Sequence, residues 1–336
     1  MNRFSIFTKM LLVLLLAVPF VSPVTSHASY DDVGIAIAIG TEASIAVLDE
    51  ETIIHSYSDN NTLFIQIGKY AENDIIWGTG KNFGPGNSPE ISTNGDSIIM
   101  VYEDVSDRST YYALGDYKEP SEITWSVKDV EYNSEVRVKP TGAYLESGWF
   151  VEFHNAGNFG IDYTVGDVDS DRIFWDQKRE FESDNINPSV TALDDHAMLI
   201  LSEDIDDNST YYSVGSLDAV RGTLAWSDNK KFIDGDNASV VQLNNGEILA
   251  MASSEARLPV PIGPLLPAMK YSIGSLGVGN QIDWDNTDNI HSFYSTSLDL
   301  AVMDDGVIVN LYTRNGLLYT DLGHLDNGNI IWQNVN

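Results

Sequence analysis

The sequence feature that most constrains the fold is a repeat marked by tryptophan. Six of the seven tryptophans recur at intervals of 48 to 58 residues, and each follows a glycine by 9 to 11 residues. An aliphatic residue stands directly before each glycine. The six pairs are Gly68 and Trp77, Gly115 and Trp125, Gly166 and Trp175, Gly215 and Trp226, Gly274 and Trp284, and Gly323 and Trp332. Markers that stay in phase over six copies indicate one structural unit used six times.

Each copy contains runs of strand length. Within residues 86–125 there are four such runs, at 88–92, 98–102, 110–114 and 122–126. A tight-turn signal, Asn94-Gly95, separates the first two, as a hairpin requires. Four short strands in a repeat of about 50 residues are typical of a propeller blade. The sequence therefore predicts an all-β fold, a six-bladed β-propeller with four antiparallel strands in each blade.

The two ends of the repeat region predict how the ring closes. The first copy enters through residues 43–47, and the last copy ends at Trp332. Residues 33–39 alternate isoleucine and alanine, so we expect them to pair beside the final strand and help to close the ring. Closure protects sheet edges that would otherwise invite aggregation. An open solenoid and a seven-bladed ring with one degenerate copy are the alternative architectures.

Residues 1–28 have the composition of a secretory signal peptide. Arg3 and Lys9 form a basic start, an apolar run covers residues 10–18, and small residues precede a cleavage point after Ala28. The alternative is an uncleaved membrane anchor, but the apolar run is short for a membrane span. We therefore expect residues 29–336 to form a single propeller domain that is secreted or periplasmic and has no integral membrane segment.

The charge balance restricts the classes of partner. The chain has 18 lysines and arginines against 50 aspartates and glutamates, a formal net charge of −32. Such a surface repels nucleic-acid phosphates and anionic lipids, so we expect no nucleic-acid partner. It suits cations, neutral ligands or basic partners. The absence of cysteine excludes disulfides, zinc-thiolate sites and thiol catalysis.

Four short motifs resemble those of a known group of proteins. They are Asn187-Pro188-Ser189-Val190 at a blade entry, Val151-Glu152-Phe153-His154 in a second strand, Tyr211-Tyr212-Ser213-Val214-Gly215 in a third and Ile123-Thr124-Trp125 in a fourth. With these motifs the chain resembles secreted β-propeller repeat proteins of the lectin-like and sialidase-like type. The resemblance implies a propeller over residues 30–336 and points to carbohydrate binding.

The chain departs from both types at the residues that define their sites. Sialidase blades carry a Ser-x-Asp-x-Gly-x-x-Trp turn, whereas residues 171–175, Asp-Arg-Ile-Phe-Trp, lack the glycine. Sialidases also hold the substrate carboxylate with three arginines, and fucose-binding lectins repeat an arginine in each pocket between blades. The arginines of this chain do not recur at one blade position. The resemblance therefore implies fold more strongly than activity.

The end of the second strand is the most informative position for ligand binding. An aromatic or small residue there is followed by a carboxylate, histidine or hydroxyl. Carboxylates accept hydrogen bonds from sugar hydroxyls, and aromatic rings offer a flat apolar face. The alternative interpretation is a strand that ends in a solvated turn, since turns are rich in polar residues. The candidate ligand-binding residues are Tyr57, Asp59, Tyr102, Glu103, His154, Glu203, Tyr312 and Arg314.

The repeated tryptophans have two interpretations. They are either stacking platforms for sugar rings or packing residues between blades. One fixed position in each blade favours packing, because a large indole dominates its surroundings. Trp149 stands outside the register, and neither interpretation is favoured for it.

Asp167, Asp169 and Asp171 alternate as at the start of a calcium loop. Carboxylate oxygens are the ligands that calcium prefers. The run lacks the central glycine and the distal glutamate of such loops, so acidic hairpin turns are the alternative interpretation. Calcium is the one cofactor that the sequence suggests.

The fifth copy carries an apolar, proline-rich insertion at residues 257–269. Its four prolines predict a loop without regular secondary structure. Exposed apolar loops usually contact something. The candidate partner contacts are Leu258, Val260, Ile262, Leu265 and Leu266. A plug folded over one mouth of the central channel is the alternative.

These features favour a secreted, lectin-like module that binds a glycan or another extracellular ligand and has no chemistry of its own. Neither a Gly-x-Ser-x-Gly nor a His-Glu-x-x-His motif occurs in the chain. Two alternatives stay open. One is a glycoside hydrolase or sialidase-like enzyme with a single site at the channel mouth. The other is an adhesin or protein-interaction scaffold that uses the insertion in the fifth blade.

Overall fold

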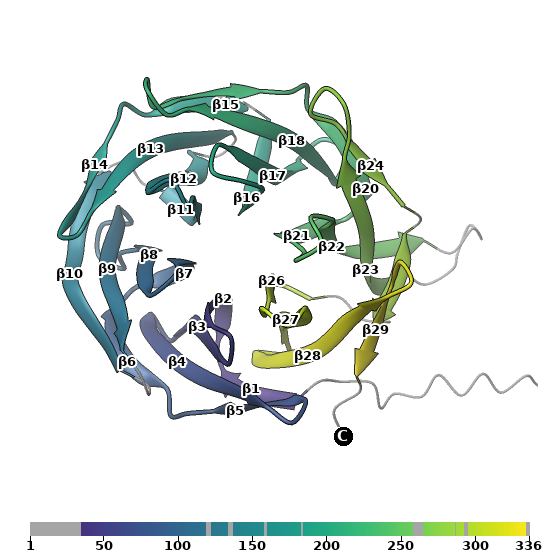
Figure 1. Cartoon of the computed structure of the whole chain (residues 1–336), viewed down its shortest axis with the longest axis horizontal. Helices are drawn as coiled ribbons and strands as arrows, with labels where there is room; N and C mark the ends of the chain where they lie inside the picture. Colours follow the sequence, from purple (N-terminus) through teal and green to yellow (C-terminus); the bar gives the residue numbers. More distant parts are fainter. Residues whose placement is uncertain are drawn as a thin grey trace, which may run out of the picture. The chain divides into compact units, whose positions relative to one another are not determined.

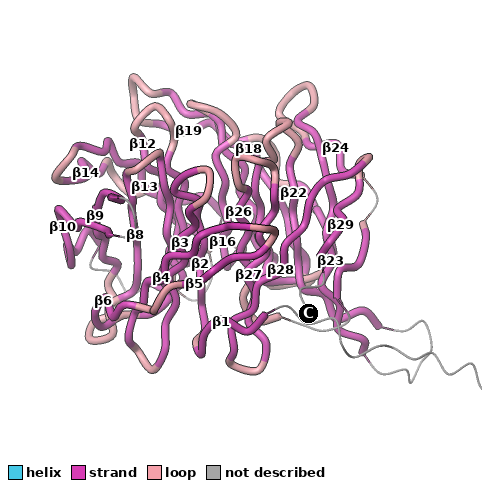
Figure 2. Tube along the Cα trace, turned by 60° about the horizontal axis from the view of Figure 1, so that its bottom comes forward, coloured by secondary structure: helices cyan, strands magenta, loops and turns pink. Residues whose placement is uncertain are grey.

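The computed structural model describes residues 35–118, 122–133, 137–157, 160–182, 184–257, 265–285, 287–291 and 295–333. Residues from Val33 to Asn336 form one compact unit. In its described part every regular element is a strand, as Figure 2 shows. Six sheets are arranged radially around a central axis (Figure 1). The prediction of an all-β, six-bladed propeller is confirmed.

Each blade is an antiparallel sheet whose first strand lies nearest the axis (Figure 1). Blade one contains β2 (Thr41–Asp49), β3 (Thr52–Asp59), β4 (Thr62–Ala71), β5 (Asp74–Trp77) and β6 (Lys81–Pro85). Blade two contains β7 (Asn87–Asn94), β8 (Ser97–Glu103), β9 (Thr110–Lys118) and β10 (Glu122–Asn133). Blade three contains β11 (Arg137–Tyr144), β12 (Trp149–Ala156), β13 (Ile161–Asp169), β14 (Arg172–Trp175) and β15 (Arg179–Glu182).

The other three blades repeat this order. Blade four contains β16 (Asn185–Ala192), β17 (Ala197–Asp204), β18 (Ser209–Asp218), β19 (Thr223–Trp226) and β20 (Lys230–Asp234). Blade five contains β21 (Asp236–Gln242), β22 (Ile248–Arg257), β23 (Leu265–Leu276), β24 (Ile282–Trp284) and β25 (Asp288–His291). Blade six contains β26 (Leu298–Val302), β27 (Val307–Arg314), β28 (Leu317–Asp326) and β29 (Asn329–Gln333), together with β1 (Ile35–Ile39).

The third strand of most blades carries two short strands on its outer edge. β4 pairs with β5 along one half and with β6 along the other. The same pattern holds for β13, β18 and β23. In blade two the single long strand β10 spans both halves of β9. Four strands form the body of each blade, as predicted, and the short fifth strand is an addition that the sequence analysis missed.

The N-terminal strand β1 completes the last blade. It pairs antiparallel with β28, from Ile35 opposite Thr320 to Ile39 opposite Leu317. β29 covers the other half of β28. In blade six, β1 therefore takes the place that the fifth strand takes elsewhere. The expectation that this segment helps to close the ring is confirmed, although its partner is β28 and not the final strand itself.

The repeated glycine and tryptophan face each other across the third and fourth strands. Gly68 pairs with Trp77 and Gly215 with Trp226, and the other four pairs of the repeat have the same register. A Cβ at Gly68 would lie 2.8 Å from the Trp77 ring, and one at Gly215 would lie 2.4 Å from the Trp226 ring. The indole folds over the strand where only glycine leaves room, which explains why the two residues recur together.

The hydrophobic core is divided among the junctions between blades. Each of six clusters of buried side chains joins residues of two neighbouring blades. The repeated tryptophans belong to these junctions. The Trp284 ring, for example, lies 4.4 Å from Phe232 of blade four, and the Trp226 ring lies 4.8 Å from Phe181 of blade three. The interpretation of the tryptophans as packing residues between blades is confirmed.

The insertion of the fifth copy extends a hairpin. β22 and β23 continue beyond the length of their counterparts, with Ala256 opposite Leu266 and Glu255 opposite Pro267. The expectation that prolines exclude regular structure from residues 257–269 is therefore wrong at both ends of the segment. β25 pairs only with residues 269–271 of β23, so in the described part Pro267 lies where β23 has one neighbour and a missing N–H costs least. Leu258, Val260 and Ile262 lie outside the described residues, as do the side chains of Leu265 and Leu266.

Among the described residues, no helix is long and apolar enough to cross a membrane.

Candidate functional site

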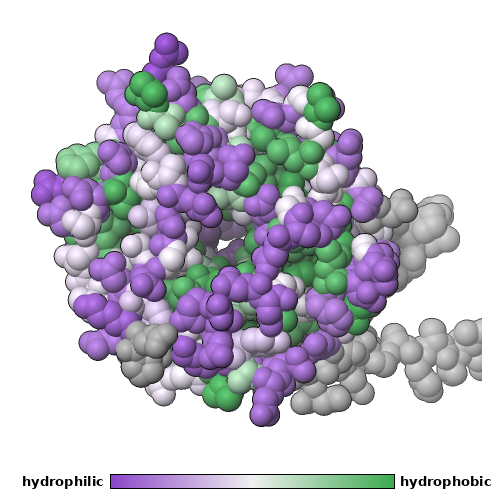
Figure 3. All heavy atoms as spheres, viewed as in Figure 1, coloured by the Kyte–Doolittle hydropathy of each residue, from purple (hydrophilic) through white to green (hydrophobic). Residues whose placement is uncertain are grey.

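A channel follows the axis between the six innermost strands. Its mouth, where these strands begin, is a pocket of about 110 Å³. Figure 3 shows the other end of the channel, a hollow at the centre of the opposite face with hydrophilic side chains around it. The mouth is lined by Glu42, Ala43, residues 88–90, residues 139–141, residues 187–189, Asn237, Ala238 and residues 296–299. All six blades contribute to this lining.

The inner strands are bent at the mouth by a repeated bulge. The bulge follows a non-glycine residue with positive φ: Glu42 (49°), Ser88 (45°), Lys139 (54°), Asn187 (51°) and Asn237 (45°) in blades one to five. Each of them lies within a register shift against the second strand. Bulges re-aim side chains, and a non-glycine residue in this conformation costs about 1–3 kcal/mol. Strain repeated at one mouth makes that mouth the first candidate for a functional site.

Three carboxyl groups line this mouth, those of Glu42, Glu90 and Asp299. Glu90 of β7 and Asp299 of β26 line both the pocket and the channel beneath it. Thr141 donates a hydrogen bond to Glu90 over 3.2 Å. Asp299 accepts hydrogen bonds from the Ser239 hydroxyl at 3.1 Å and from the backbone N–H of Ile45 at 2.7 Å. These bonds join blade two to three, five to six and six to one.

Partial burial raises the pKa values of Glu90 and Asp299. It raises the pKa of Asp299 from 3.8 to about 6, against the lowering effect of its hydrogen bonds. Burial and the nearby charge of Asp299 raise the pKa of Glu90 well above its usual value. Both shifts favour the protonated forms of Glu90 and Asp299, which can donate a hydrogen bond as well as accept one. A pair of carboxyl groups of this kind can donate hydrogen bonds to the hydroxyl groups of a ligand and accept hydrogen bonds from them. It can also exchange a proton with the ligand.

The mouth differs from the sialidase pattern that the resemblance implied. Among the residues that line it, Lys139 is the cation, and arginine is absent. An arginine trio for a carboxylate substrate is therefore not assembled in this described pocket. Hydroxyl, amide and carboxyl groups make up most of its polar lining.

The aromatic and histidine candidates from the second strands lie inside the blades. Tyr102, Tyr312 and His154 are fully buried, and Tyr57 is nearly so. The Tyr102 hydroxyl donates to Asp129 at 2.6 Å, and His154 Nδ1 lies 2.8 Å from Glu152 Oε1. The rings are thus packed among protein atoms rather than presented at the rim.

The polar candidates lie at the rim with partners of their own. Arg108 donates to Glu103 Oε1 at 2.6 Å, and Asn60 donates to Asp59 at 2.8 Å. Arg314 ends β27 half-buried. The structure thus brings Glu103 and Glu203 to the side of the molecule where the mouth opens but leaves neither in the lining of the pocket.

The polar residue at the end of the second strand holds the entry of the next blade. Asn155 accepts a hydrogen bond from the backbone N–H of Asn187 at 2.7 Å, and Glu203 accepts one from the backbone N–H of Asn237. Glu203 also accepts from the Asn187 side chain at 2.7 Å. The register places Asn155, and not its neighbour His154, at the position that Glu203 occupies in blade four. This link between blades is the feature that sequence reasoning missed.

Acidic side chains of the β13–β14 turn form their contacts with neighbouring residues of the same turn. Asp171 pairs with Arg172 at 2.9 Å, a contact that lowers the pKa of Asp171, and Asp169 accepts from the backbone of Ser170. Asp167 and Asp169 are exposed at the end of β13. In the part of the chain that the structure describes, no group of three acidic or histidine side chains could hold a metal ion. The calcium site at Asp167, Asp169 and Asp171 stays a prediction.

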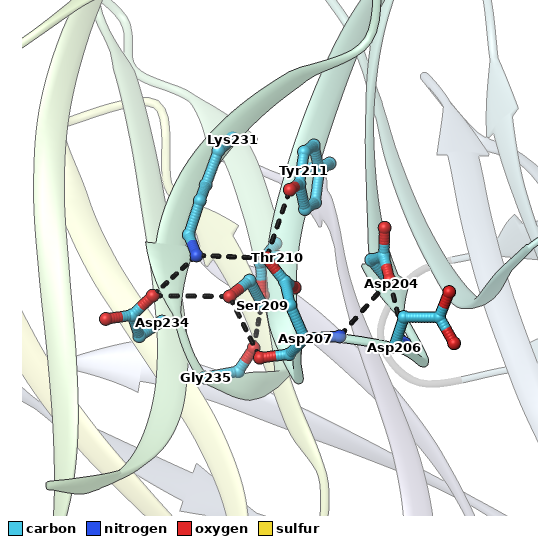
Figure 4. Close-up of polar contacts among 9 residues, drawn as sticks. All are labelled: Asp204, Asp206, Asp207, Ser209, Thr210, Tyr211, Lys231, Asp234 and Gly235. Atoms are coloured by element: carbon cyan, nitrogen blue, oxygen red, sulfur yellow. Dashed lines mark hydrogen bonds and ion pairs between the residues drawn. The ribbon is translucent and has the colours of Figure 1, made fainter.

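A second acidic group, on blade four, contains a lysine. Lys231 lies 3.1 Å from Asp207 and 2.7 Å from Asp234, and these hydrogen bonds raise the pKa of Lys231 (Figure 4). Tyr211 donates to Asp207 at 3.1 Å. The cluster joins the β17–β18 turn to β20 as a surface ion-pair network, which contributes modestly to stability.

Comparison with solved structures finds six-bladed propellers of two kinds. A Hadza microbial sialidase superposes with a TM-score of 0.60 and 9% identity over 85% of this chain and 67% of its own. The NanB sialidase of Streptococcus pneumoniae gives 0.59 and 9% over 89% and 70%. The Aleuria aurantia lectin in complex with α-methyl-L-fucoside gives 0.60 and 12% over 88% and 96%. No family model and no curated protein matches the chain.

These likenesses show the fold alone, since identity is 12% or less. At that level, the resemblance to lectin-like and sialidase-like propellers is confirmed. The neighbours include both enzymes and lectins, so the fold does not choose between catalysis and binding. The choice between catalysis and binding depends on the residues that line the axial mouth.

Proposed function

We propose that this protein is exported and binds a carbohydrate at a single site on the propeller axis, in the mouth lined by Glu90 and Asp299. The observation that carries the proposal is the convergence of hydroxyl, amide and carboxyl groups from six blades on one pocket. A sugar presents many hydroxyl groups, each of which both donates and accepts hydrogen bonds. Glu90 and Asp299, whose raised pKa values favour forms that both donate and accept hydrogen bonds, match that requirement.

The axial site replaces the repeated sites expected from the second strands. The rings at those strand ends are buried, and Glu203 is engaged by two asparagines of neighbouring entries. At the mouth, by contrast, the carboxyl groups come from blades one, two and six, while Thr141 and Ser189 supply hydroxyls at the positions of blades three and four that are equivalent to Glu90. A site of this asymmetry binds one ligand per molecule rather than one per blade.

Glycoside hydrolysis is the second candidate, and one specific observation favours it. Glu90 and Asp299 have raised pKa values and influence each other through their charges. Glycoside hydrolases use one carboxylic acid to protonate the leaving oxygen and a second carboxylate as base or nucleophile. Glu90 would take the first role and Asp299 the second.

The test combines binding and cleavage on the same glycans. The purified full chain is screened on a glycan array, and each bound sugar is titrated against wild type, Glu90→Gln and Asp299→Asn. Because a hydrogen bond to a neutral group contributes about 0.5–1.5 kcal/mol and one to a charged group about 1.5–3 kcal/mol, Glu90→Gln should weaken binding several-fold and Asp299→Asn roughly tenfold or more. Glu50→Gln, in the exposed β2–β3 turn, is the matched control and should bind as wild type does.

The outcomes separate the two candidates. Saturable binding without release of reducing sugar supports the binding protein. Release of sugar that is lost in both carboxyl variants supports the hydrolase. A blank array, or binding that neither carboxyl variant weakens, contradicts the axial site.

A further inference from the structure

Four of the junctions between blades share one tyrosine contact. A tyrosine three residues before the repeated glycine packs edge-on against the tryptophan of the next blade. The pairs are Tyr112 and Trp175, Tyr163 and Trp226, Tyr212 and Trp284, and Tyr271 and Trp332, with ring centroids 5.8 to 6.3 Å apart. Each ring fills the space beside an indole at a junction.

The tyrosine hydroxyl also forms hydrogen bonds with backbone groups of the outer strand of the next blade. Tyr212 accepts a hydrogen bond from the backbone N–H of Ile282 at 3.3 Å and donates one to its carbonyl at 3.2 Å. Tyr112 accepts from the N–H of Ile173 at 3.4 Å. Ile282 and Ile173 each stand two residues before the repeated tryptophan. The phenol ring and its hydroxyl therefore act together at the junction.

Blade one has an isoleucine where these blades have tyrosine. Ile65 lies three residues before Gly68, and the tryptophan beyond it is Trp125 of blade two. Ile65 is shorter than tyrosine and has no hydroxyl to offer the backbone of Ile123, which stands two residues before Trp125. In the sixth junction, where Thr320 holds the position, the His55 ring lies against Trp77 instead, at 4.6 Å.

The space beside Trp125 is a cavity of about 290 Å³. Ile65, Ile67, Ile123, Phe83 and Trp125 supply its apolar wall. Lys128 lies 3.9 Å from the Phe83 ring centroid and donates to the Phe83 carbonyl at 2.9 Å, so its chain forms part of the wall. The cavity lies among β4, β6 and β10, on the outer strands of the ring (Figure 1).

We propose that this cavity is a binding site for a phenol ring. The ligand ring takes the place of the missing tyrosine against the edge of Trp125, and its hydroxyl bonds to the backbone of Ile123. The same chemistry is offered by a free small phenolic compound and by an exposed tyrosine of a partner protein. The site lies away from the axial mouth and does not depend on the proposed function.

The probe is p-cresol, which is the tyrosine side chain without its backbone. Calorimetric titration of the purified full chain should show saturable binding with one site per molecule. Toluene has the same ring and methyl group without the hydroxyl, and it should bind roughly tenfold more weakly, as the loss of one hydrogen bond predicts. N-acetyl-tyrosinamide distinguishes the sources, because it binds only if the cavity admits a tyrosine attached to a main chain.

Two substitutions fill the cavity from within. Ile65→Tyr restores the residue of the other junctions, and it should abolish p-cresol binding while it keeps or raises the melting temperature. Ile65→Phe fills the same volume without a hydroxyl and should also abolish binding, so the test survives if one of the two variants fails to fold. The reverse change, Tyr212→Ile, should open a matched cavity beside Trp284 and add a second p-cresol site. Absence of saturable binding to wild type, or binding unchanged in the folded Ile65 variants, would overturn the proposal.

Discussion

Gly215 lies directly opposite Trp226 in the β18–β19 ladder, so close that a Cβ on the glycine would stand 2.4 Å from the indole. The six repeated pairs share this arrangement. The glycine therefore lets each indole fold onto its strand and reach the neighbouring blade. Small size, rather than a special backbone angle, is what this position demands, because Gly215 is not among the residues with positive φ.

Gly215→Ala should destabilise the protein by about 1–3 kcal/mol, the usual cost of forcing extra volume into a packed site. The urea midpoint measures the change. In a Trp226→Leu background the same substitution should cost less, since the clash is with the indole. Ala225→Ser, on the exposed face of the same strand, is the control and should shift stability by less than about 0.5 kcal/mol. Equal costs in both backgrounds would contradict the steric explanation.

The N-terminal strand offers a matched pair of substitutions for ring closure. Ile37 packs against the core cluster that joins blades six and one, whereas Ile39, at the end of the same strand, is 67% exposed. Ile37→Asp should lower stability by about 2–4 kcal/mol, because it removes apolar contacts and places a charge at the junction. Ile39→Asp should change the thermal midpoint little. Equal effects of the two variants would show that β1 does not stabilise the ring through this contact.

The six-bladed architecture could be predicted from the sequence because each blade needs the same packing residues, which therefore recur at a regular interval. The glycine and indole must recur in phase, and the hairpin turns between them carry their own signals. The fifth strand was missed because it is four or five residues long and lacks a turn signature. The insertion was assigned to a loop from its prolines, yet Pro267 occupies a strand position with a single neighbour.

The candidate site was less predictable, for physical reasons. The bulges depend on backbone angles at residues as different as Glu42, Lys139 and Asn237, which share no side-chain signature. The alignment by hairpin turns also selected His154, whereas the pairing of each second strand with its third strand makes Asn155 the equivalent of Glu203. Glu90 and Asp299 lie far apart in the sequence and meet only because the ring closes. A carboxyl pair of that origin has no local spacing to recognise.

Glu203 allows the link between blades to be tested by itself. Its carboxylate accepts hydrogen bonds from the Asn187 side chain and from the Asn237 backbone. Glu203→Ala leaves the Asn237 N–H without that acceptor and should cost about 1–3 kcal/mol. Asp206→Ala, in the exposed turn of the same hairpin, is the control and should cost much less. A loss of glycan binding in folded Glu203→Gln without a loss of stability would instead assign Glu203 to the ligand site.

The carboxyl pair predicts a pH dependence of stability with a definite sign. Burial raises the pKa of Asp299 to about 6 and that of Glu90 well above its usual value. The folded protein therefore holds these protons more tightly than the unfolded chain, whose carboxyl groups titrate near pH 4. The stabilisation from this pair is complete below about pH 4 and is lost as the pH rises through about 6. Asp299→Asn and Glu90→Gln cannot release the proton, so between about pH 5 and pH 8 their urea midpoints should fall less than that of wild type. Identical pH dependence in all three proteins would show that the two carboxyl groups are not held protonated in the mouth.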